Sequence, residues 1–272
     1  NWSSGFLPTT HSGVRLRNQG EPMLNLSRPS DISSTEDQAT AAALRAMNAQ
    51  RQRQELDPAI DARISSYELA YRMQTEAPDV MDLSKESKET LEMYGADPKV
   101  PSFARACLLA RRMVERGVRF INIYHEGWDA HSDVVGNITG NARATDKASA
   151  ALVTDLKQRG LLDDTIVIWG GEFGRTPMVE SNKALGRSQG RDHHPAAYSM
   201  WFAGGGFKQG FTFGETDDLG FNVVKDPVHV HDIQATILHC LGIDHKRLTY
   251  RFAGRDYRLT DVHGQVVASL LT

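Results

Sequence analysis

This chain has few cysteines, no long apolar run and no excess of positive charge, and each of these features argues against a class of protein. Only two cysteines occur in 272 residues, Cys107 and Cys240. Both lie in apolar stretches typical of helices, so buried free thiols are expected rather than a disulfide. No apolar segment approaches the roughly 20 residues that span a bilayer. The net charge of -3 argues against nucleic acid or an anionic membrane as the main partner.

Two common catalytic signatures are also missing. The Gly204–Gly206 run is followed by no Lys-Ser/Thr pair and opens no helical pattern, which argues against a phosphate-binding loop. No Gly-x-Ser-x-Gly motif occurs, which disfavours a serine hydrolase of the α/β type. The chain shows no signal peptide, but it begins with Asn1, so this says nothing about compartment.

The elements that are present predict an α/β fold. Apolar residues make up 40% of the chain and charged residues 24%, as in soluble globular proteins. Strands are expected over 118–124, 165–169 and 198–203. Helices are expected over 36–75 with a break near Pro58, and over 82–94, 102–115, 142–159 and 231–241. This order predicts a doubly wound, mainly parallel sheet with helices on both faces. Residues 1–272 are interpreted as a single domain, with an extended segment at 1–30 and a mainly helical insertion at 31–117.

The segment from Asp164 to Pro177 is the most informative part of the chain. Its β-branched apolar run predicts a strand buried on both faces, and Glu172 and Arg175 follow that run directly. A carboxylate at the end of a buried strand is costly unless it is paired or binds a metal. Glu172 is therefore either an ion-pair partner of Arg175 or a metal ligand. In the second case Arg175 is free to bind phosphate or sulfate through its guanidinium group.

Two further polar clusters favour a metal site. Asp129 and His131 lie two residues apart after a predicted strand, and a carboxylate with an imidazole suits zinc or a similar divalent ion. The alternative is a loop aspartate beside a surface histidine. His193 and His194 follow a polar loop, where one can bind a metal and the other support it, or both can be functionally silent.

In combination these motifs resemble one known family. The segments that show the resemblance are Asn1–Pro8, Trp128–His131, Glu172–Pro177, Gly190–His193, His231–His239 and Leu248–Asp256. They resemble the domain-of-unknown-function 1501 family, bacterial and usually exported sulfatase-like proteins grouped with the alkaline phosphatase superfamily. The resemblance runs nearly end to end.

The resemblance implies a metal centre at the carboxyl ends of a parallel sheet. Asp129, His131 and His193 fit the places of one metal's ligands, with His194 as a further candidate. Glu172 fits the carboxylate of a second metal, but Phe173 replaces the histidine usual there, which puts a full second site in doubt. The metal is expected to be zinc, with calcium, magnesium or manganese as alternatives.

Two features usual in the superfamily, its first metal-binding aspartate and its nucleophile, have no counterpart in this chain before residue 100. Either the chain is an N-terminally truncated member, or the family has lost the usual chemistry. The resemblance thus leaves two functions open. One is metal-dependent hydrolysis of a small sulfate or phosphate ester, such as a sulfated carbohydrate, with Arg175 stabilising the anionic transition state. The other is a non-catalytic, exported binding protein on the same scaffold. Neither the substrate nor the oligomeric state follows from the sequence.

Overall fold

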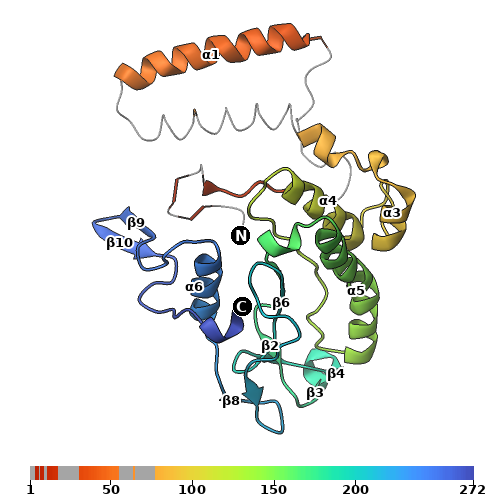
Figure 1. Cartoon of the computed structure of the whole chain (residues 1–272). Helices are drawn as coiled ribbons and strands as arrows, with labels where there is room; N and C mark the ends of the chain where they lie inside the picture. The colour runs from red at the N-terminus through yellow and green to blue at the C-terminus, as the bar shows by residue number, and fades with distance from the viewer. Residues whose placement is uncertain (1–3, 6, 9–10, 18–30, 55–63, 65–76) are drawn as a thin grey trace. The chain divides into compact units, whose positions relative to one another are not determined.

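The computed structural model describes residues 4–5, 7–8, 11–17, 31–54, 64 and 77–272 (Figure 1). The described chain forms two compact units. The first comprises Asn1–Glu92 with Ala96–Ile121, and the second comprises Met93–Gly95 with Asn122–Thr272. The predicted extended segment at 1–30 and the helix break near Pro58 lie largely or wholly outside the described residues.

Serine side chains cap the starts of two helices in the first unit. In the first unit, α1 spans Ser34–Gln54, and Ser33 and Glu36 exchange hydrogen bonds at its start as a capping box. The helix α4 spans Phe103–Glu115, and Ser102 accepts a hydrogen bond from the backbone N–H of Arg105. Both helix starts are thus stabilised by hydrogen bonds between residues three positions apart.

The second unit contains two long helices. The helix α5 spans Val134–Gln158 and begins eight residues before its predicted start, because Asp133 caps it by accepting the N–H of Gly136. The helix α6 spans Val230–Cys240 with a capping box of His229 and Asp232. Shorter helical elements are η2 (Leu83–Lys85), α3 (Lys88–Tyr94), η3 (Leu162–Asp164), η4 (Lys183–Leu185) and η5 (Ala268–Leu270), and residues 77–81 are also helical. No helix among the described residues combines the length and apolarity needed to cross a membrane.

The predicted doubly wound parallel sheet is wrong. All strands in the described part of the chain belong to five two-stranded antiparallel sheets. The pairs are β1 (Val167–Trp169) with β6 (Trp201–Ala203), β2 (Gly174–Arg175) with β5 (His193–His194), β3 (Glu180–Asn182) with β4 (Arg187–Gly190), β7 (Glu215–Thr216) with β8 (Val223–Lys225), and β9 (Thr249–Phe252) with β10 (Arg255–Arg258).

The reason for this error is visible in two apolar runs. Residues 118–124 form no strand, and Phe120 and Tyr124 are 70% and 60% exposed. The run at 165–169 does form β1, but β1 pairs only with β6, and Ile168 and Trp169 are exposed rather than buried. Composition therefore located β1, and also β6 within the predicted strand 198–203, but it did not indicate that these two strands pair with each other in the antiparallel direction.

Each unit has a core built on a helix. In the first, α4 buries Cys107 and Leu108, and burial raises the pKa of the Cys107 thiol to about 12. Both Cys107 and Cys240 are free thiols, as the sequence predicts, but only Cys107 is buried and Cys240 is half-buried. In the second, the α5 residues Ala148 and Leu156 are buried, and Asp155 accepts hydrogen bonds from Tyr94 (3.1 Å) and Arg159 (2.7 Å).

Candidate metal centre

Two short sheets in the second unit carry the candidate centre. In the pairing of β2 with β5, Arg175 lies opposite His193. This register is possible because residue 174 is glycine: a Cβ there would lie 2.3 Å from the carbonyl oxygen of Ala197. A hydrogen bond of 2.9 Å from Thr176 N–H to Asp192 C=O extends the pairing by one step. Backbone geometry therefore brings the arginine and the histidine to the same place.

The loop that contains His131 is held against β4. The N–H of Arg191 donates to Ala130 C=O at 2.8 Å, and that of Asp133 donates to Ser188 C=O at 3.0 Å. Gly190 makes the close approach possible, since a Cβ at that position would lie 2.1 Å from the backbone of His131. The loop and the strand are thus fixed to each other on both sides of His131.

Asp129, His131 and His193 converge at this point. One carboxylate oxygen of Asp129 lies 2.9 Å from Nε2 of His193 and 3.1 Å from Nε2 of His131. The three ligand atoms all lie within 4.8 Å of one another. Tetrahedral zinc with ligand bonds of about 2.0–2.1 Å separates its ligands by about 3.3 Å. The spacing and the carboxylate–imidazole donor set therefore fit a divalent ion such as zinc.

Arg175 contacts the same carboxylate. Its Nη2 lies 2.7 Å from the Asp129 oxygen, and its guanidinium group lies 5.7 Å from the centre of the Phe173 ring. Hydrogen bonds from His193 and from Arg175 lower the pKa of the Asp129 carboxyl to about 2. Asp129 is therefore ionised throughout the physiological pH range, the state that a metal ligand requires.

Glu180 contacts Nδ1 of His131, the ring nitrogen that does not face Asp129. Its carboxylate lies 2.6 Å from Nδ1 of His131, and Arg187 donates to the other carboxylate oxygen at 2.7 Å. Hydrogen bonds from His131 and Arg187 lower the pKa of Glu180 below its usual value. A carboxylate on Nδ1 holds the proton there, so Nε2 is free to bind a metal on the side of Asp129.

The sequence prediction missed Glu180 altogether. This residue is separated from His131 by 49 positions, and it carries no motif that distinguishes it from other acids in the chain. It also belongs to a second group of possible ligands, together with His131 and Asp192. Only the pairing of β3 with β4 places it beside the histidine.

Other residues nominated from the sequence lie elsewhere. Glu172 is exposed and belongs to neither group of possible metal ligands found among the described residues. His194 is buried, with its Nε2 2.5 Å from the carbonyl oxygen of Phe221 and its ring packed on that side chain. Phe173 packs against the imidazole of His193 at 4.5 Å between ring centres. The structure thus brings together Asp129, His131, His193 and Arg175, and leaves Glu172 and His194 outside the cluster.

Comparison with known proteins identifies a family but no characterised relative. No curated protein and no solved structure matches the chain. Residues 1–271 match a family described as Protein of unknown function (DUF1501). Since the match covers almost the whole sequence, the chain belongs to the DUF1501 family.

Proposed function

We propose that this protein is a metal-dependent hydrolase of sulfate or phosphate esters. The observation that supports it best is the convergence of Asp129, His131 and His193 with Arg175 on one side of the cluster. Catalytic zinc sites typically use three protein ligands and keep a fourth position open. The Asp129 and His193 side chains are 63% and 46% exposed, so a small substrate can reach that open position.

We also propose that the protein is related to the sulfatase-like proteins of the alkaline phosphatase superfamily. Support for this relationship comes from the motifs Trp128–His131, Glu172–Pro177 and Gly190–His193, and the sheet topology does not contribute to it. The substrate class is a small anionic ester, such as a sulfated carbohydrate. Export from the cell is a further part of the proposal, based on the same resemblance.

Each residue of the cluster has a distinct role in this proposal. A bound divalent ion supplies Lewis acidity, which stabilises negative charge on the ester and makes nearby water more acidic. Glu180 fixes the ring of His131 so that Nε2 faces the ion, and ionised Asp129 binds it without releasing a proton. Arg175 presents a planar pair of donors to the tetrahedral anion, whose charge spreads over several oxygens during ester cleavage.

Arg175→Lys tests this assignment. The lysine keeps the charge but loses the planar pair of donors, so we expect kcat/KM to fall by at least about 10-fold while the metal content is retained. The measurement is hydrolysis of 4-nitrophenyl sulfate and 4-nitrophenyl phosphate by the metal-loaded protein, with and without chelator. Arg143→Lys, at an exposed position of α5, is the matched control and is expected to leave the rate unchanged.

Two outcomes would contradict the proposal. If the metal-loaded protein hydrolyses neither ester, the metal cluster serves a non-catalytic binding protein instead. If hydrolysis occurs but is equally fast in Arg175→Lys, Arg175 has no role in stabilising the anion.

A further inference from the structure

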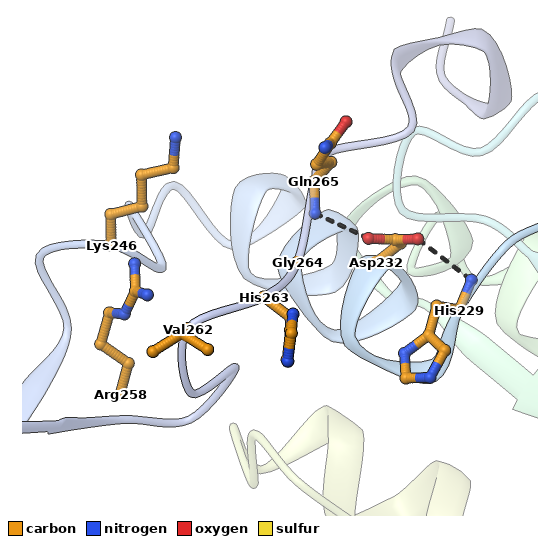
Figure 2. A pocket seen from close by; sticks show the side chains of 8 residues that line it. All are labelled: His229, Asp232, Lys246, Arg258, Val262, His263, Gly264 and Gln265. Atoms are coloured by element: carbon orange, nitrogen blue, oxygen red, sulfur yellow. Dashed lines mark hydrogen bonds between the residues drawn. The ribbon is translucent and has the colours of Figure 1, made fainter.

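A cavity in the second unit shares no residue with the metal cluster. Its volume is about 560 Å³, and it lies at the start of α6 beside the end of β10 (Figure 2). The lining residues are His229, Asp232, Lys246, Arg258, Val262, His263, Gly264 and Gln265. This volume lies within the range of about 300–1,000 Å³ that is typical of sites for small organic molecules.

The walls of this cavity are held in place by buried contacts. Nδ1 of His245 lies 2.8 Å from Oγ1 of Thr260, and both residues are buried. This contact joins the loop that carries Lys246 to the loop that follows Arg258. Gly264 packs against the start of α6, where a Cβ would lie 2.9 Å from the carbonyl oxygen of His231. The cavity is therefore formed before any ligand binds.

Two positive charges face the cavity without partners. Neighbouring cations of the β9–β10 hairpin are paired: Arg251 with Asp256 at 3.2 Å, and Arg255 with Asp261 at 2.9 Å. By contrast, the charged groups of Lys246 and Arg258 make no ion pair or hydrogen bond within the described part of the chain. Figure 2 shows Arg258 beside Val262, with Lys246 on the same side of the view beyond Arg258.

Asp232 is the one acid among the residues that line the cavity, and its carboxylate already accepts two hydrogen bonds. The two carboxylate oxygens of Asp232 accept the N–H of His229 at 3.0 Å and the N–H of Gln265 at 2.8 Å (Figure 2). Asp232 therefore fixes the backbone at the rim rather than pairing with Lys246 or Arg258. The imidazole of His263 and the side-chain amide of Gln265 are further hydrogen-bonding groups among the lining residues.

We propose that this cavity binds a small organic molecule carrying a phosphate or sulfate group. Arg258 binds the tetrahedral anion through its paired donors, Lys246 adds a second positive charge, and Val262 contacts the organic part. The cavity is larger than a lone phosphate requires, which favours an organic ester or phosphonate over the inorganic ion. This site is independent of the proposed hydrolytic centre.

Binding of phenylphosphonate, measured by isothermal titration calorimetry, tests the proposal. The whole chain is used in its metal-free form with the substitution Arg175→Gln, so the metal cluster cannot contribute an anion site. We expect saturable binding of one phenylphosphonate per chain. Adding Arg258→Gln is expected to weaken it by about 10-fold or more, since charge-assisted, bidentate hydrogen bonds are the strong ones.

Arg251→Gln is the matched control, because Arg251 lies in the same hairpin but pairs with Asp256 and does not line the cavity. It is expected to leave the affinity unchanged. Equal loss of binding in Arg251→Gln and Arg258→Gln would show attraction by the general charge of the hairpin and would overturn the proposal. Wild-type affinity in Arg258→Gln, or the absence of saturable binding, would also overturn the proposal.

Discussion

Replacing His193 by alanine is expected to lower the affinity for zinc by more than about 100-fold. The substitution removes one of three converging ligands, and loss of a supporting residue alone typically costs 10–100-fold. Because the His193 side chain is 46% exposed, the alanine leaves no buried cavity, and the fold should persist. Competition with a zinc-binding dye measures the affinity, and circular dichroism confirms that the variant is folded.

His239→Ala provides the matched control for this experiment. His239 is an exposed histidine of α6 and belongs to neither group of possible ligands among the described residues. Its replacement should leave the zinc affinity within about two-fold of that of the unmodified protein. An unchanged affinity in His193→Ala would show that zinc is bound elsewhere.

Replacing Glu86 by alanine is expected to destabilise the first unit by about 3 kcal/mol. The Glu86 side chain is 6% exposed and binds Arg111 at 2.5 Å and also Arg112. The Arg111 side chain is 2% exposed, so removing Glu86 leaves a buried charge with fewer partners. Arg111 keeps its bond to Glu115, at 2.7 Å, so we expect a loss at the lower end of the usual range of about 3–5 kcal/mol.

The measurement is urea unfolding followed by circular dichroism at 222 nm. Glu92→Ala is the matched control, because Glu92 makes an exposed pair with Lys88 at 3.6 Å, and such pairs contribute little. Similar midpoints for Glu86→Ala and Glu92→Ala would contradict the assigned role of Glu86.

The same carboxylate predicts how stability depends on pH. Burial raises the pKa of Glu86, but hydrogen bonds from Arg112 and Arg111 outweigh it and leave the pKa below the usual 4.5. A lowered pKa in the folded state stabilises the fold above the unfolded pKa. The stability difference between the unmodified protein and Glu86→Ala should therefore be constant above about pH 4.5 and shrink as the pH falls below it.

The positions of α4 and α6 could be predicted from the sequence because their signals are local, whereas α5 begins eight residues before its predicted start. The capping residues Ser33, Ser102 and Asp232 lie within a few positions of the groups they bind. Gly160 and Gly242, which follow α5 and α6, both adopt the positive φ typical of helix ends. Such interactions need no knowledge of the rest of the fold.

The sheet topology could not be predicted from the sequence, because the partner of a strand is set by contacts between residues far apart in the chain. The run that contains β1 pairs with β6 more than 30 positions away, and it does so antiparallel and partly exposed. In the candidate metal cluster, Asp129 and His193 were nominated because carboxylates and imidazoles can bind metals, but nothing local indicated that a carboxylate oxygen of Asp129 lies 2.9 Å from Nε2 of His193. Glu180 was missed for the same reason, since only the register of β3 with β4 brings it to His131.

X-ray absorption spectroscopy of the zinc-loaded protein shows whether Asp129, His131 and His193 bind the ion. We expect one zinc ion per chain, surrounded by light atoms at about 2.0–2.1 Å that include two imidazoles from His131 and His193. The outer-shell scattering of one imidazole should disappear in His193→Ala. A sulfur ligand at about 2.3 Å, a spectrum without imidazole scattering, or failure to retain zinc would contradict the account.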